Sequence, residues 1–382
     1  MLKLSGYAIV VGMVFYLSFA QSFGAPPSVK GRVDASSPPV NPSGTFGVVD
    51  PGAVEIVKVG PDRNAELRDG AYRGMALQIS YTADGIEPYL KEIDEIAALG
   101  ANTLGISTAG YQEHAGSAGI TIDVRKSPTP EQFRQLIRRA KSKNMRVVLI
   151  PVILLSNPRG NEWRGVIQPP DWDEWFSSYL FFIKYFAKIG LDNNVDALAI
   201  GAELISTESF RTRWEKVISE TRRIYHGKLL YSSNWDHYRQ VSFWDKLDYI
   251  GMTTYHKLSD KENPDLKTLM ASWSKIKKEI LDWRKTIGKP IFFTEVGWCS
   301  QPGASVEAWN YYRYQKPSKE GLEEQKRCYE AFIRTWRNEK SVAGTLWWEW
   351  TCDGSGPEDF GYTPKGKPAE QVLRAWYAEG KP

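Results

Sequence analysis

The strongest constraint on the fold is an alternation of short apolar segments with longer amphipathic ones, which begins near residue 74. Residues 74–79 (GMALQI) form a short apolar run typical of a buried strand. Residues 88–99 (PYLKEIDEIAAL) place apolar side chains at helical spacing and end at Gly100, a common helix terminator. Further strands are expected at 102–106, 145–154, 196–201, 228–232, 247–252, 290–294 and 342–348. Further helices are expected from about 129, and at 171–189, 210–225, 265–286, 320–338 and 368–377.

Eight β/α repeats over roughly 300 residues predict an α/β fold of the (β/α)8 TIM-barrel type, with a single catalytic domain at 61–382. Several of the strands are apolar throughout, as expected for strands that are covered on both faces. The alternative is a doubly wound open sheet. That fold would normally carry a glycine-rich phosphate turn after its first strand, and the sequence there is Ser80-Tyr81-Thr82.

The first 60 residues have a different character from the rest of the chain. Residues 1–20 combine Lys3 with an apolar run too short for a comfortable membrane span, which predicts a signal peptide or, alternatively, an uncleaved N-terminal anchor. Residues 21–60 are rich in Pro, Ser and Gly, a composition typical of a flexible linker. The protein is therefore expected to be secreted, or periplasmic or at the cell surface, with a membrane tether if the segment stays attached.

Charge and cysteine content exclude several classes of partner. The net charge is only +4 and the two signs are interspersed, so no nucleic-acid partner is expected. The three cysteines do not form a disulfide framework. Export permits one bridge, for which Cys299 and Cys352 are the expected pair, and Cys328 is expected to be helical and buried. Metal-binding spacings of Cys or His are missing from the sequence, so neither a metal nor a cofactor is expected.

Polar and aromatic residues follow several of the predicted strands. In a barrel, chemistry takes place where strands end and the following loops begin. The residues that follow predicted strands four to eight include two carboxylates, an amide, a phenol and several indoles. They are Glu203, Asn234, Tyr255, Glu295, Trp298, Trp348 and Trp350. The 15 Trp and 19 Tyr of the chain favour a carbohydrate substrate, because sugar rings stack on aromatic faces, but a Trp-rich core would also explain them.

Glu203 and Glu295 follow strands four and seven, which can face each other across a barrel of eight. Two facing carboxylates suit glycoside hydrolysis, since one must donate a proton and the other must be ionised. Proximity separates their pKa values, because two like charges resist joint ionisation. The alternative is that each is an ordinary strand-end charge paired with a nearby Lys or Arg. We favour the catalytic interpretation for the pair.

The remaining site candidates have two interpretations each. Asn234 lies in a turn-like SSNWD segment and is either a turn residue or a sugar ligand. Tyr255 is either a core residue or a site residue. Trp348 and Trp350 alternate with Trp347 along one strand, so only one set faces the lumen, and spacing does not say which.

From about Gly74 to Trp376, the sequence resembles glycoside hydrolase family 113, the endo-β-mannanases, within the retaining TIM-barrel glycosidase clan A. The specific motifs are IGAELIS (200–206), LYSSN (230–234), FTEVGW (293–298) and LWWEW (346–350). The resemblance implies a double displacement in which Glu203 is the general acid/base and Glu295 the nucleophile, with carboxyl groups about 5–5.5 Å apart. It implies a hydrogen bond from Tyr255 to the nucleophile, and sugar contacts from Asn234, Trp348 or Trp350, and Trp298.

The sequence departs from the clan at Ala202, where the wider clan commonly has an Asn that holds the sugar 2-hydroxyl. Either another residue binds that hydroxyl or the sugar preference differs. The expected function is a secreted retaining endo-β-glycanase acting on β-1,4-mannan or glucomannan. The alternatives are a transglycosylase or hydrolase of another β-glycan, and a non-catalytic glycan-binding barrel. The aromatic insertion 300–319 is expected to wall a subsite.

Overall fold

In the computed structural model, eight parallel strands close into a barrel, and the structure describes residues 71–379. The first strand pairs in parallel with both the second and the last, which closes the sheet. The barrel strands are β1 (Tyr72–Ile79), β2 (Thr103–Gln112), β4 (Arg146–Leu155), β5 (Ala197–Ala202), β6 (Lys228–Ser233), β7 (Tyr249–Thr253), β8 (Ile291–Val296) and β9 (Val342–Trp350). The predicted (β/α)8 fold is confirmed. The predicted segments 1–20 and 21–60 lie outside the described residues, as does the start of the domain predicted at 61–382.

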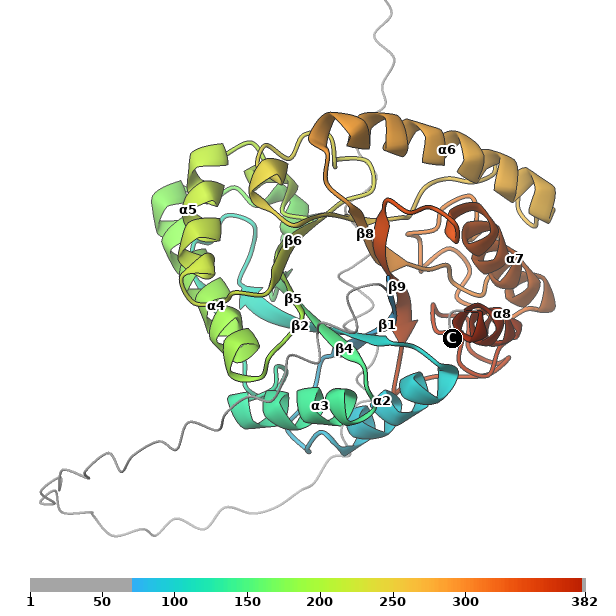
Figure 1. Ribbon diagram of the computed structural model, residues 1–382, viewed down its shortest axis with the longest axis horizontal. Coiled ribbons are helices and arrows are strands. Elements are labelled where there is room, and N and C mark those ends of the chain that lie inside the picture. The colour runs from blue at the N-terminus through green and yellow to red at the C-terminus, as the bar shows by residue number, and fades with distance from the viewer. Residues whose placement is uncertain (1–70, 380–382) are drawn as a thin grey trace, which may run out of the picture. The chain divides into compact units, whose positions relative to one another are not determined.

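Seven α-helices surround the strands in the described part of the chain (Figure 1). They are α2 (Glu87–Leu99), α3 (Pro130–Ser142), α4 (Trp172–Asp192), α5 (Arg211–Arg222), α6 (Leu266–Ile287), α7 (Lys319–Trp336) and α8 (Pro368–Ala378). Their ends follow local rules: Thr129 and Gln132 form a capping box at the start of α3, and Gly100 adopts the left-handed conformation after α2. Of the helices in residues 71–379, none is both long and apolar enough to cross a membrane.

One of the eight repeats has no α-helix. Between β6 and β7 the chain forms only the 3-10 helix η3 (Trp244–Lys246). Trp244 covers the barrel there, because its ring packs against Tyr231 and Trp283 and its indole N–H donates to the carbonyl of Tyr238. A short antiparallel strand, β3 (Ile120–Thr121), extends the sheet beside β2.

Strand β4 shows how the core is divided. Val148, Val152 and Leu154 belong to the apolar cluster inside the barrel, whereas Val147 and Leu149 belong to the larger cluster between strands and helices. This alternation is the period of two expected of a strand that is buried on both faces. The interior cluster also includes Ala202, the residue before Glu203, so the apolar filling stops where the polar rim begins.

The described residues contain no disulfide, since all three cysteines of the chain are free thiols. The expected pair, Cys299 and Cys352, is therefore not bridged. Cys299 is buried, whereas Cys352 is half-buried in the loop after β9, and positions just past two strand ends do not by themselves bring two thiols together. Cys328 lies on α7 and is fully buried, as predicted.

Candidate active site

The carboxyl ends of the barrel strands surround a small cavity that contains Glu295. Its wall comes from five strands and from the connection after β4, and it is lined by Gln78, Ser107, Val152, Leu154, Arg164, Glu295 and Trp348. Polar side chains are thus concentrated at the end of the barrel where the interior apolar cluster stops. This is the end at which barrel loops supply chemistry.

Glu203 follows directly on β5 in a conformation that is unusual for a side chain other than glycine. Its φ is 52°, in the left-handed region, which costs of order 1–2 kcal/mol for an L-residue. Neighbouring hydrogen bonds hold the turn: the Glu203 N–H donates to the carbonyl of Ser232 (2.8 Å), and the Leu204 N–H donates to the Tyr231 hydroxyl (2.9 Å). The chain accepts a strained turn here, and the Glu203 side chain is fully buried.

Two donors contact the Glu203 carboxyl. The Arg164 guanidinium donates to Oε2 over 2.6 Å, and the Thr253 hydroxyl donates to Oε1 over 3.3 Å. Burial raises the pKa of Glu203, while the charge and hydrogen bond of Arg164 oppose that rise. A buried carboxyl with a raised pKa is a group that can hold and release a proton near neutral pH.

Glu295 lies on β8 and is 3% exposed. The Tyr255 hydroxyl donates to its Oε2 over 2.7 Å, which is the contact expected from the sequence. Burial, and then the charge of Glu203, raise the pKa of Glu295 to about 8, while Arg164 and the Tyr255 hydrogen bond lower it. Each carboxyl therefore disfavours ionisation of the other, and the pair readily retains one proton between them.

The tryptophans near strand ends occupy different environments. Trp348 lines the cavity beside Glu295, whereas Trp347 faces the helices and stacks on Tyr329 of α7 with ring centroids 4.5 Å apart. Of these two tryptophans, Trp348 therefore faces the lumen and Trp347 faces the helices.

Two of the predicted sugar contacts are not brought to the cavity. Trp298 is fully buried and packs against Trp273 and Tyr329, on the helix side of β8. The Trp350 indole N–H donates to Glu95 on α2 over 3.1 Å. Neighbouring helices decide where both indoles pack: Trp298 lies among aromatic rings of α6 and α7, and Trp350 reaches the Glu95 acceptor on α2.

Asn234 is 3% exposed and lies directly after β6. Its side-chain amide donates to Asp236 over 2.8 Å, and Asp236 also contacts the His237 ring (2.6 Å). The charge of Asp236 in turn raises the pKa of Glu203. Its contacts tie Asn234 to its own turn, and its expected sugar contact stays a prediction.

Several site residues were not predicted. Arg164 lies in the 3-10 helix η1 (Arg164–Val166), inside a connection whose sequence has no periodic signal. Thr253 is the last residue of β7 and cannot be told from an ordinary strand threonine. Gln78 could have been found, because it is the one amide in the otherwise apolar run GMALQI.

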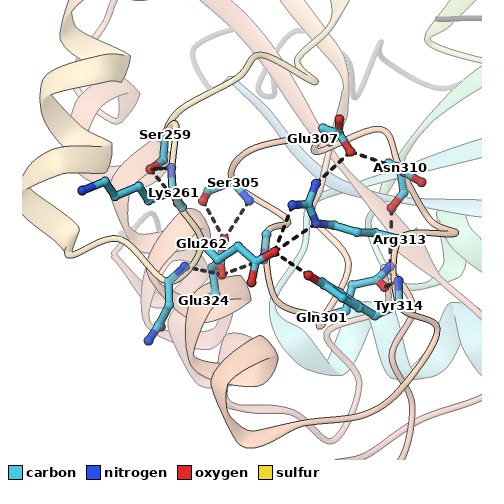
Figure 2. Close-up of polar contacts among 12 residues, drawn as sticks. Ser259, Lys261, Glu262, Gln301, Ser305, Glu307, Asn310, Arg313, Tyr314 and Glu324 are labelled. Atoms are coloured by element: carbon cyan, nitrogen blue, oxygen red, sulfur yellow. Dashed lines mark hydrogen bonds and ion pairs between the residues drawn. The ribbon is translucent and has the colours of Figure 1, made fainter. Parts of the chain in front are cut away.

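The insertion after β8, residues 300–319, is tied to the neighbouring connection after β7. Arg313 bridges Glu262 and Glu307, with 2.9 Å contacts to both, and Figure 2 shows these ion pairs. Glu324 of α7 accepts four hydrogen bonds: from the N–H and hydroxyl of Ser305 (2.9 and 2.6 Å), from the Gly303 N–H (3.0 Å) and from the Asn263 N–H (2.8 Å). The insertion therefore has a polar core of its own, formed by these ion pairs and hydrogen bonds.

The insertion reaches the candidate site through one tyrosine. Tyr362 donates a hydrogen bond to the carbonyl of Ala308 over 2.8 Å, and its ring lies 6.1 Å from that of Tyr255. Within the insertion Trp309 is half-buried, whereas Tyr314 is exposed and donates to Glu262. Through Tyr362 the insertion thus supports Tyr255, which donates a hydrogen bond to Glu295. The expected role of the insertion as a subsite wall stays a prediction.

The sequence and the fold both have known relatives. Residues 78–367 match the family described as Glycoside Hydrolase Family 113. Among solved structures, the chain is similar to a family 113 β-mannanase from Alicyclobacillus acidocaldarius in complex with ManMIm, with a TM-score of 0.71 at 24% identity over 81% of this chain and 98% of that one. No curated protein sequence matches the chain.

Two further structures are similar over most of the described barrel. A family 113 β-1,4-mannanase has a TM-score of 0.69 at 24% identity, covering 82% of this chain and 100% of that one. A β-glucuronidase from Faecalibacterium prausnitzii has a TM-score of 0.54 at 14% identity, covering 81% of this chain and 49% of that one. At these identities the structural likeness concerns the fold.

Proposed function

Because the chain belongs to glycoside hydrolase family 113, we propose that it is a retaining endo-β-1,4-mannanase that cleaves β-mannan or glucomannan with Glu203 and Glu295. The observation that carries the proposal is the pairing of two buried carboxyls whose pKa values are raised, with Tyr255 hydrogen-bonded to one of them. The substrate class is supported by the β-mannanases to which the chain is similar.

The proposed reaction has two steps. In the first, a Glu295 oxygen attacks the anomeric carbon, the glycosidic bond breaks, and the Glu203 proton passes to the leaving oxygen. In the second, Glu203 takes a proton from water, the water oxygen attacks the anomeric carbon, and the ester to Glu295 breaks. The configuration is inverted twice and thus retained, and a separation of the carboxyls of about 5–5.5 Å is expected.

The test is hydrolysis of a glycan panel that contains β-mannan, glucomannan, xylan and mixed-linkage β-glucan. We expect release of reducing ends from the first two, and NMR should detect the β-anomer as the first product. Transfer products at high substrate concentration, seen by mass spectrometry, would instead identify a transglycosylase. Binding without any bond cleavage would contradict the proposal and indicate a glycan-binding barrel.

We also propose that residues 1–20 direct the chain out of the cytoplasm, since a polymeric glycan has to be met outside the cell. Expression of the full chain followed by N-terminal sequencing tests this. Recovery of the product in the cytoplasm with Met1 in place would contradict it.

Tyr255→Phe is expected to lower kcat/KM on mannan roughly tenfold at neutral pH, since a hydrogen bond to a charged group is worth about 1.5–3 kcal/mol. The Tyr255 hydrogen bond lowers the pKa of Glu295, so its loss raises that pKa. Glu295 must be ionised to attack, and the acid limb of the pH–rate profile should therefore move to higher pH.

The matched control for this prediction is Tyr185→Phe, which removes the hydroxyl of a half-buried tyrosine on α4. It should leave the profile unchanged. An unmoved acid limb in Tyr255→Phe would show that the hydrogen bond does not tune Glu295.

A further inference from the structure

Arg164 brings a buried positive charge to Glu203. Its side chain is 4% exposed, that of Glu203 is fully buried, and Nη2 lies 2.6 Å from Oε2. The local chain holds the guanidinium in place: the Trp163 ring packs so closely on Gly165 that a Cβ there would lie 2.3 Å from it. The Gln168 N–H, two residues after η1, donates to the carbonyl of Ala115 over 2.8 Å.

This contact suits only one of the two states that Glu203 passes through. A guanidinium donates hydrogen bonds and accepts none, so it stabilises the carboxylate far more than the carboxylic acid. The other charged or titratable groups that face Glu203 come from four further parts of the chain. The charge of Glu203 raises the pKa values of Glu208, His237, Tyr255 and Glu295, and the charge of Asp236 raises that of Glu203. Among these, the carboxylates disfavour the ionised form of Glu203, and Arg164 opposes them.

A general acid needs its proton in the first step, and a general base must have lost it before the second. Resting on the proposed function, we propose that Arg164 serves the second step, holding Glu203 as the carboxylate that takes the proton from the attacking water. Arg164 is thus a positioning residue that acts through Glu203.

The charge balance of the reaction agrees with this role. After the first step Glu295 is esterified and neutral, while Glu203 has given its proton to the leaving oxygen and is negative. The Arg164 cation is then the nearest counter-charge to a buried anion. When water transfers its proton to Glu203 and its oxygen displaces Glu295 from the sugar, the negative charge returns to Glu295, whose pKa Arg164 also lowers.

Arg164→Met and Arg164→Lys test the proposal on an aryl β-mannobioside with a good leaving group and on unactivated mannan oligosaccharides. With the activated substrate the first step needs little acid assistance. We expect Arg164→Met to lower kcat by about tenfold to a hundredfold while kcat/KM is nearly unchanged, with a burst of phenol equal to the enzyme concentration. Arg164→Lys should lie between this variant and the wild type.

Two further readouts separate this role from a structural one. Azide attacks as an anion and needs no base, so it should restore turnover of Arg164→Met and give the β-glycosyl azide. Without the cation Glu203 keeps its proton to higher pH, so the basic limb of kcat/KM on unactivated substrates should move up.

The matched control is Arg159→Met in the same connection, where an arginine that is 62% exposed pairs with Glu162. It should behave as the wild type. Equal losses in kcat and kcat/KM for Arg164→Met, without a burst or azide rescue, would overturn the inference. If Arg164→Met does not fold, the same measurements are made on Arg164→Lys. A wild type that cleaves none of the glycans would instead overturn the proposed function.

Discussion

Glu295→Ala and Glu203→Ala are each expected to lose at least about a hundredfold in kcat on β-mannan, since positioned proton transfer alone contributes about 10²–10⁴-fold. Glu295→Ala removes the group proposed to form the glycosyl–enzyme ester, so without an added nucleophile it should be inactive on every substrate. Glu203→Ala removes only proton transfer, so it should still form the intermediate from a substrate with a good leaving group. Release of reducing ends and of phenol measures the two effects.

Azide distinguishes the two roles more sharply than rates alone. In Glu203→Ala, azide should attack the glycosyl–enzyme and give a β-glycosyl azide, with retention. In Glu295→Ala it should take the place of the missing nucleophile and give the α-product, with inversion. If the two variants gave products of the opposite configurations, the assigned roles would have to be exchanged.

The matched control is Glu113→Ala, since Glu113 also follows a barrel strand directly but is exposed. It should keep full activity. A comparable loss of activity in Glu113→Ala, or full activity in either Glu203→Ala or Glu295→Ala, would contradict the catalytic roles. Glu203 and Glu295 would then be ordinary strand-end charges.

Glu324→Ala is expected to cost about 3–5 kcal/mol of unfolding free energy, because four donors lose a buried charged acceptor. For a domain of this size we expect the melting temperature to fall by roughly 6–10 °C. Glu324→Gln keeps the volume and one acceptor oxygen but turns an amide toward backbone N–H groups, so it should lose about half as much. Calorimetry and urea unfolding measure both variants.

Glu323→Ala is the control for this prediction. The Glu323 side chain is 40% exposed and pairs with Lys326, so less than about 0.5 kcal/mol should be lost. Equal stability of Glu324→Ala and Glu323→Ala would show that the polar core of the insertion does not stabilise the fold. Activity should fall with Glu324→Ala as well, because Ala308 of the insertion holds Tyr362 against Tyr255.

The barrel could be predicted from the sequence because parallel strands covered on both faces are short apolar runs. Strand ends were harder to predict. β2 was expected at 102–106, yet it runs from Thr103 to Gln112 and pairs with β4 throughout. Its second half, STAGYQ, consists mostly of small and polar residues that resemble a loop, and pairing with a long apolar neighbour keeps it extended. The local sequence does not contain that information.

The site could be predicted in part for a similar reason. Glu203 and Glu295 were found because the barrel geometry assigns a common rim to residues that follow strands. Arg164 was not found, since it reaches Glu203 from inside a connection of irregular conformation. Trp298 and Trp350 were assigned to the rim by position alone, while their packing is decided by α7 and α2, elements far away in the sequence.

The free thiols described above have a practical consequence. Because no covalent cross-link joins the parts of the barrel within residues 71–379, its folding requires no oxidant and its stability should not depend on glutathione or other reductants. The enzyme should therefore be obtainable in active form from the reducing cytoplasm of an expression host, even if its own route leads outside the cell. Exposure to dithiothreitol should leave both its melting temperature and its turnover unchanged.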